Sequence, residues 1–144
     1  MTRGRKKIST RRNGFTLVEM VVTLSVMGLI AAITLPNFNG YLRHQRVIGM
    51  RNQLIADMYY ARSLAISNRR TFAIRFQADR YVIVDTTNNK VARTIMTPSG
   101  VQVVAAGNAN FYAWGLSDAT NITLSGSSAR TVVTLMPTGS VEHD

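Results

Sequence analysis

The chain has no cysteine among its 144 residues, which excludes disulfide bonds, cysteine metal ligands and thiol catalysis. Its only two histidines, His44 and His143, lie far apart, and no His, Asp or Glu cluster has the spacing of metal ligands. A glycine-rich phosphate loop is also missing. These absences argue against an enzyme and against a bound metal or cofactor.

Acidic residues are few, with seven Asp and Glu against seventeen Lys and Arg. The imbalance is concentrated at the start of the chain, where six basic residues precede residue 13: Arg3, Arg5, Lys6, Lys7, Arg11 and Arg12. Without these six, eleven basic residues face seven acidic ones, and the formal net charge falls from +10 to +4. A charge of +4 does not by itself indicate nucleic acid as a partner.

A long apolar run begins abruptly at Phe15, directly after Gly14, and extends to Leu35. About 20 apolar residues are enough for a helix to cross a bilayer, so the run predicts a membrane helix. Glu19 is the only charge in it, and an ionised side chain there costs roughly 2.5–3.5 kcal/mol on insertion scales. The carboxylate therefore needs a partner. An amine released by cleavage between Gly14 and Phe15 would lie about one helical turn away, or face Glu19 from a neighbouring subunit.

The place of the glycine distinguishes this segment from an ordinary secretory signal, which is cut after its apolar core. The best late candidate, Ala32-Ile33-Thr34, fits such a site poorly. Gly14 instead precedes the core and offers a protease an unhindered backbone. The basic leader, residues 1–14, is expected to stay in the cytoplasm by the positive-inside rule.

The residues Gly14, Phe15, Thr16, Leu17 and Glu19, followed by the apolar run, closely resemble the type III signal of type IV pilins and type II secretion pseudopilins. This resemblance implies that a prepilin peptidase cuts after Gly14 and methylates the new amine of Phe15. It also implies that Glu19 pairs with that amine during filament assembly. The mature chain would cross the bacterial inner membrane once, with its C-terminal domain in the periplasm, before it enters a filament.

The helix is expected to continue beyond the membrane. Pro36 follows the apolar run and predicts a helix kink, because proline removes a hydrogen bond. An amphipathic stripe follows at spacings of three and four residues, with Asp57 and Arg62 off or beside it: Val47, Met50, Leu54, Met58, Ala61 and Ala65. A helix from Phe15 to about Asn68 would be roughly 80 Å long at about 1.5 Å per residue, too long for a small domain to bury. We divide it into a membrane and polymerisation half, residues 15–36, and an amphipathic half, residues 37–68.

Beyond the helix, the apolar period changes to the alternation typical of strands. Residues 69–144 are therefore expected to form an antiparallel β domain packed on the distal half of the helix, an α+β, pilin-like fold. The expected strands are Thr71–Gln77, Arg80–Asp85, Val91–Met96, Val101–Ala105, Phe111–Trp114, Ile122–Leu124 and Thr131–Met136. For the aromatic residues Tyr59, Tyr60, Tyr81 and Trp114, core packing is favoured over an exposed binding face.

A second resemblance narrows the class. The run Leu54–Arg70, with Ala61-Arg62, Ala65-Ile66 and Asn68, resembles the GspH/FimT-type family, whose members are minor pseudopilins and minor type IV pilins. Leu64 departs from it, because a glutamate is common there. The run Met136–Ser140 resembles the Pro-x-Gly turn that closes the family's domain. The lack of cysteine agrees with a minor subunit, since many major pilins close a C-terminal loop with a disulfide.

These resemblances imply a non-enzymatic, GspH-like minor pseudopilin that assembles into or primes the pseudopilus of a type II secretion system. The alternative is a FimT/FimU-like minor subunit in type IV pilus assembly, which could also bind DNA for uptake. The expected partners are other pilins or pseudopilins, the prepilin peptidase and methyltransferase, the inner membrane and a secreted cargo. The sequence disfavours nucleic acid, for which the candidate contacts are Arg69, Arg70, Arg75 and Arg130.

Overall fold

The computed structural model describes residues 14–144, except for the side chains of residues 34–39. The basic part of the predicted leader, up to Asn13, lies outside the described residues. The chain divides into two compact units, Met1–Asn37 and Phe38–Asp144, and one helix, α1 (Leu17–Asn68), contributes to both. The predicted helix is confirmed, with its start two residues later than expected.

The first unit contains the N-terminal part of α1. Every residue from Gly14 to Ile33 is exposed, including the large apolar side chains. None of the helical segments that the structure describes combines the length and the apolar character required to span a bilayer. The backbone at Pro36 belongs to α1, but its side chain is not described, so the kink stays a prediction.

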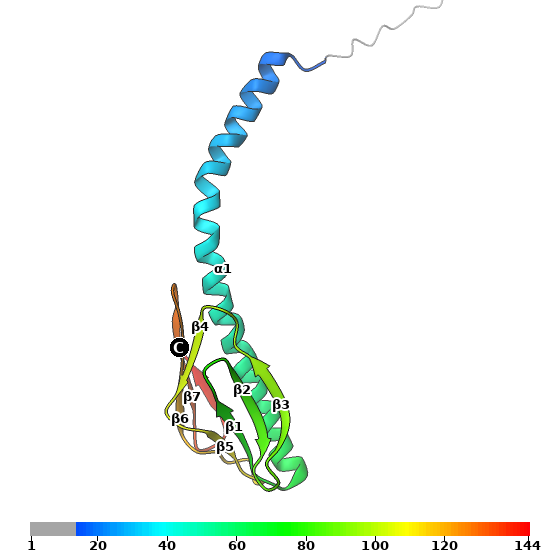
Figure 1. The fold of residues 1–144 in the computed structure, drawn as a ribbon, viewed down its shortest axis with the longest axis vertical. Coiled ribbons are helices and arrows are strands. Elements are labelled where there is room, and N and C mark those ends of the chain that lie inside the picture. Colours follow the sequence, from blue (N-terminus) through cyan, green and yellow to red (C-terminus); the bar gives the residue numbers. More distant parts are fainter. Residues whose placement is uncertain (1–13) are drawn as a thin grey trace, which may run out of the picture. The chain divides into compact units, whose positions relative to one another are not determined.

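The second unit combines the remainder of α1 with two antiparallel sheets, each of four strands (Figure 1). One sheet has the order β3-β2-β1-β5 and the other the order β4-β6-β7-β8. Their strands are β1 (Phe72–Phe76), β2 (Arg80–Asp85), β3 (Lys90–Met96), β4 (Val101–Ala105), β5 (Ala109–Phe111), β6 (Thr120–Gly126), β7 (Arg130–Leu135) and β8 (Val141–His143). The predicted α+β, pilin-like fold class is therefore confirmed.

The core of this unit lies between α1 and the inner faces of the two sheets. All six stripe residues of α1 are buried, from Val47 to Ala65. They pack against alternate residues of the strands, which are Phe72, Ile74, Tyr81 and Ile83 in one sheet and Ile122, Leu124, Val133 and Leu135 in the other. The predicted stripe is thus confirmed, because helical spacing placed these side chains on the single face of α1 that the sheets cover.

Two strand predictions were wrong in detail. The predicted strand Phe111–Trp114 lies mostly outside β5, which ends at Phe111 and is followed by a turn. Trp114, Tyr59 and Tyr60 are 79%, 48% and 43% exposed, so their expected core packing was also wrong, whereas Tyr81 is fully buried as expected. The short strand β8, after the turn at residues 137–140, was missed.

Candidate functional site

The start of α1 holds the residues predicted for processing and assembly. Gly14 and Phe15 precede the helix and are exposed, and a β-carbon added at Gly14 would meet no atom within 4 Å. Glu19 lies in the first helical turn, and its main-chain N–H donates to Oγ1 of Thr16 at 3.2 Å. Thr16 therefore acts as the N-cap, which satisfies one of the free donors at the helix start. The Gly14–Phe15 peptide bond is accessible, and α1 begins shortly after it, at Leu17.

The N-cap at Thr16 was not predicted, although its signal is present in the sequence. A threonine followed three residues later by a glutamate is the capping-box pattern, and Thr16 and Glu19 have this spacing. A carboxylate in the first turn is also favoured by the partial positive charge of a helix N-terminus. Among the described residues, no Lys or Arg forms an ion pair with Glu19.

In the second unit, Arg62 connects α1 to two turns that are distant in the sequence. Its guanidinium donates through Nε to the carbonyl oxygen of Gly115 at 2.9 Å, through Nη1 to that of Gly139 at 3.1 Å, and through Nη2 to that of Thr138 at 3.0 Å. The two segments that carry the second family resemblance, around Ala61-Arg62 and Met136–Ser140, therefore meet in space.

The two turns approach Arg62 through glycines with positive φ angles. These angles are +81° at Gly115 and +76° at Gly139, in the region that disfavours other residues. A β-carbon at Gly139 would overlap the carbonyl oxygen of Gly115 and lie 2.8 Å from Nε of Arg62. Only glycine fits there without moving the arginine.

A second polar cluster surrounds Asp57, which is only 1% exposed. Its Oδ2 accepts hydrogen bonds from the Tyr81 hydroxyl at 2.7 Å and from Nε2 of Gln53 at 3.0 Å. Its Oδ1 pairs with Nη1 of Arg93 on β3 at 2.8 Å. Burial and, secondly, the hydrogen bond to Asp57 raise the pKa of Tyr81 well above its usual range. The cluster ties the edge strand β3 to the helix.

The spacing of Asp57 could have indicated this burial. It lies three residues after Leu54 and four before Ala61, so it belongs to the buried stripe rather than beside it. A carboxylate on such a face needs hydrogen-bond partners, which Tyr81 and Arg93 supply.

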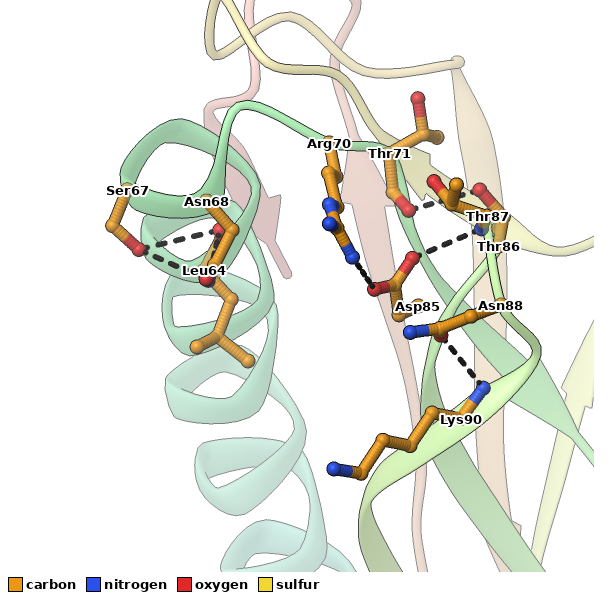
Figure 2. A network of polar contacts seen from close by, with 10 residues as sticks. All are labelled: Leu64, Ser67, Asn68, Arg70, Thr71, Asp85, Thr86, Thr87, Asn88 and Lys90. Atoms are coloured by element: carbon orange, nitrogen blue, oxygen red, sulfur yellow. Dashed lines mark hydrogen bonds and ion pairs between the residues drawn. The ribbon is translucent and has the colours of Figure 1, made fainter.

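Of the four arginines predicted as a nucleic-acid patch, Arg70 is already paired. Figure 2 shows its guanidinium directed at Asp85, where Nη1 lies 3.2 Å from Oδ2. The main-chain N–H of Thr87 donates to the other oxygen of Asp85 at 2.9 Å. That hydrogen bond, with a smaller contribution from Arg70, lowers the pKa of Asp85. Figure 2 also shows Thr71 bonded to Thr86 beside this pair, so the pair joins the end of α1 to the β2–β3 turn.

Of the other three arginines, Arg130 is separated from it by the topology. Arg75 donates to Oδ1 of Asn89 at 2.8 Å, and Arg69 closes the helix with a φ angle of +53°. Arg130 belongs to the other sheet, where it pairs with Ser125 beside Gly126. Gly126 lies against Val47, which is 22 residues before Arg69 along α1, or about 33 Å of helix. Arg130 is therefore at the other end of this unit from Arg69.

Within the described residues, no group of three or more His, Asp or Glu side chains could hold a metal ion. The polar clusters of the second unit join helix, strands and turns to one another. They stabilise the second unit as one folded domain.

The sequence comparisons assign this module to a class. Residues 9–35 match the model of the prokaryotic N-terminal methylation motif, which belongs to membrane-anchored pilin-like proteins. Residues 51–139, more than half of the chain, match the model of type II transport protein GspH. No curated protein sequence matches the chain.

Solved structures show the same fold at low sequence identity. The type IV minor pilin FimU of Pseudomonas aeruginosa superposes with a TM-score of 0.60 and 16% identity, over 69% of this chain and 89% of FimU. The minor pseudopilin EpsH of the Vibrio cholerae type II secretion system gives a TM-score of 0.59 and 10% identity, over 69% of this chain and 93% of EpsH.

The fold and the N-terminal motif together define a pilin-like structural subunit of the minor pseudopilin or minor pilin kind. More particularly, the chain belongs to the family of the type II transport protein GspH.

Proposed function

We propose that this chain is a minor pseudopilin of a type II protein secretion system, which assembles into or primes the periplasmic pseudopilus. One observation carries the proposal: a GspH-type domain follows, on the same chain, an N-terminal methylation motif whose apolar side chains from Phe15 to Ile33 are exposed. An apolar surface of that extent needs cover, which first the inner membrane and then neighbouring pilin-like subunits provide. The β domain stands in the periplasm and contacts neighbours or a secreted cargo.

Processing begins at the Gly14–Phe15 bond. A prepilin peptidase cuts there and methylates the amine of Phe15. The exposure of both residues, their place before the helix and the free space around Gly14 support this step. Intact-mass measurement of the membrane-extracted chain is expected to show a start at Phe15 with one added methyl group. A start at Met1 or near Thr34 would contradict it.

Assembly depends on Glu19. In lipid its carboxylate is costly, and the amine of Phe15, from the same or an incoming subunit, neutralises it. The pairing favours one axial position of a subunit in the filament. Within the filament, Pro36 allows the helix to unwind locally, because proline lacks the N–H that would donate an intrahelical hydrogen bond.

Replacing Glu19 with Val tests this role. The variant is expected to be cut and retained in the membrane as well as the native chain, because the insertion cost is removed. It should fail to cross-link to filament neighbours, because the ammonium group of Phe15 is then buried without a partner. Breaking one side of a buried ion pair costs about 3–5 kcal/mol. Glu19→Asp, which keeps the charge, is the matched control and should retain part of the cross-linking. Normal cross-linking of Glu19→Val with normal processing would show that Glu19 is not an assembly residue.

A type IV minor pilin is the second candidate, because the likeness to FimU is as close as that to EpsH. Deletion of the gene separates the two. Loss of exoprotein secretion with normal surface pili would support the pseudopilin, whereas loss of pili with normal secretion would support the minor pilin. DNA uptake is the less favoured form of the second candidate, since Arg70 is already paired and Arg130 lies far from Arg69.

A further inference from the structure

A cavity of about 330 Å³ lies in the second unit, between the last turns of α1 and the start of β3. Tyr60 and Leu64 of α1 line one part of it, and Phe72 of β1 and Val91 of β3 line another. Binding pockets in proteins are typically lined in this way, by apolar and aromatic groups with a few polar ones. The cavity is therefore suited to an apolar side chain of a partner.

Lys90 also lines the cavity and brings an unpaired positive charge to it. Its ammonium group forms no hydrogen bond or ion pair with any described residue, and its main-chain N–H donates to Oδ1 of Asn88 at 3.1 Å. Figure 2 shows the Lys90 side chain extending from the start of β3 toward α1. A carboxylate of a ligand can pair with it there.

The other charged groups around the cavity already have partners within the chain. Asp85, directly opposite Lys90 on β2, is bound in the ion pair described above. Arg93 of β3 pairs with Asp57 at 2.8 Å, and its guanidinium carbon lies 5.9 Å from the centre of the Tyr60 ring. Lys90 is thus the charged lining residue that remains available to a ligand.

β3 is an edge strand with an accessible outer side. It pairs with β2 alone, so the main-chain groups on its other side have no strand to bond to among the described residues. Of its seven residues, all but Ile95 are exposed. A bulge at Ala92, opposite the Ile83–Val84 step, and the charge of Lys90 disfavour indiscriminate pairing at this edge. An added strand must therefore match both.

We infer that β3 receives an extended segment of a partner protein as an added strand, with an apolar side chain of that segment in the cavity and an acidic one on Lys90. In this mode of recognition, main-chain hydrogen bonds supply affinity, and pockets for alternate side chains supply specificity. The inference goes beyond the proposed function and applies equally to a pseudopilin and to a minor pilin.

The position of Lys90 also fixes the spacing in the partner segment. Lys90 and the apolar walls belong to one cavity, so the acidic and apolar side chains must lie on the same face of the added strand. Successive residues of a strand point to opposite faces, and residues two positions apart share a face. The expected partner segment therefore carries an apolar and an acidic residue two positions apart.

The test uses the full chain, isotope-labelled, in micelles of an uncharged detergent. The probe is a short, end-blocked peptide of threonines in which leucine and glutamate stand two positions apart. A second peptide has the same composition with leucine and glutamate adjacent, and a third has glutamine in place of glutamate. The first peptide is expected to shift the amide resonances of Val91 and Thr94 saturably, with an affinity about three- to fivefold above that of the other two.

Charge variants give the matched comparison. Lys90→Gln should lower the affinity for the first peptide about three- to fivefold and leave the affinity for the glutamine peptide unchanged. A purely structural effect of the substitution would lower both. Arg130→Gln removes the same charge from β7, in the other sheet, and should change neither affinity. Cross-linking of the Glu19 variants and deletion of the gene test the proposed function separately from this titration.

Four results would overturn the inference. The first is equal affinity for the two arrangements of leucine and glutamate, and the second is an equal loss in Lys90→Gln and Arg130→Gln. Resonance shifts confined to β4 or β8 would place peptide binding at an edge of the other sheet. Shifts in β3 that grow with protein concentration in the absence of peptide would indicate that a second copy of the chain occupies this edge.

Discussion

Asp57 and Arg62 lie five positions apart on α1, and each gathers polar groups from strands or turns far along the chain. Asp57 receives Tyr81 and Arg93, and Arg62 reaches the turns at Gly115 and Gly139. Hydrogen bonds that involve a charged group are worth about 1.5–3 kcal/mol each, more than neutral ones. Two charged side chains thus fix where the β strands sit on the helix, while the apolar stripe supplies the general attraction.

Replacing Arg62 with Ala should therefore destabilise the second unit. The expected loss is about 2–4 kcal/mol in the free energy of unfolding, less than the sum of three bonds because water can reach the half-buried carbonyls. Urea unfolding measures it. Arg69→Ala is the matched control, since Arg69 is exposed at the helix end, and it should cost below about 0.5 kcal/mol. Equal losses in the two variants would show that the three bonds of Arg62 contribute little.

The pair of Tyr81 and Asp57 predicts a dependence of stability on alkaline pH. Burial first, and the hydrogen bond to Asp57 second, raise the pKa of the Tyr81 phenol in the folded chain. The unfolded tyrosine ionises near pH 10, so the stabilisation is complete below pH 10 and is lost as the pH rises above it. The free energy of unfolding should fall by up to about 1.4 kcal/mol per pH unit from this group.

Tyr81→Phe isolates that contribution. The variant is expected to be about 1–2 kcal/mol less stable at pH 8, because Asp57 loses a donor, yet its stability should fall less steeply above pH 10. The gap between the two proteins therefore narrows with rising pH in urea unfolding. The remaining tyrosines are common to both proteins and cancel. Parallel curves from pH 8 to 11.5 would mean that Tyr81 titrates normally in the folded state.

At the level of elements, the turns that face Arg62 decide how closely the sheets approach α1. The turn after β5 closes through a hydrogen bond from the N–H of Gly115 to the carbonyl oxygen of Tyr112 at 2.9 Å. The turn before β8 closes in the same way between Gly139 and Met136 at 2.9 Å. Both glycines are in the left-handed region, which leaves their carbonyl oxygens directed at the arginine.

Gly139→Ala is expected to lower stability by about 2–3 kcal/mol. An alanine there is strained at a φ of +76°, and its methyl group would displace Arg62 from the carbonyl of Gly115. Thermal unfolding followed by circular dichroism detects the change. Gly107→Ala is the control, because no atom lies within 4 Å of a β-carbon there and its φ angle is not positive. A loss no larger than in this control would show that the turn tolerates a side chain.

The elements differ in how well their sequence predicted them. The buried stripe of α1 and the β1–β2 hairpin follow from periodicity, because burial on one face imposes a regular pattern. Periodicity did not reveal where β5 ends, since Tyr112, Ala113 and Trp114 continue an apolar run that Gly115 bends away from the sheet. Nor did it reveal the role of Arg62, whose partners are main-chain oxygens and leave no residue pattern.

The residues of the candidate site also differ in how well the sequence predicted them. Gly14, Phe15 and Glu19 are recognisable because their motif is local, and the motif model covers them. Arg130 was grouped with Arg69 and Arg70 by charge alone, and the topology separates them.

At the level of the whole molecule, the two units have different surfaces. The described residues of the first unit expose their apolar side chains, whereas the second encloses a core shared by α1 and both sheets. In the proposed filament role, lipid and then other subunits cover this apolar surface. The second unit has its own core and can be tested alone.

A fragment that starts near Gly40 is expected to fold as a monomer without metal or cofactor. It keeps the whole stripe from Val47 to Ala65 and all eight strands, so its core is complete. Cooperative urea unfolding, unchanged by a chelator, and the mass in solution check this. A fragment that starts after Leu54 is the control. It loses three buried side chains, each worth about 2–5 kcal/mol, and should not fold.

The same fragment decides how the chain treats DNA. With Arg70 held by Asp85 and Arg130 at the other end of the unit, duplex DNA should bind only non-specifically, with a Kd no tighter than about 10⁻⁶ M at physiological salt. Each phosphate contact adds to the salt dependence, so a shallow salt slope is expected as well. Tight binding that is lost when Arg69 and Arg70 are replaced with Ala would reverse the preference for secretion and favour a pilus subunit in DNA uptake. Weak binding that those replacements leave unchanged would support the proposed secretion role over a role in DNA uptake.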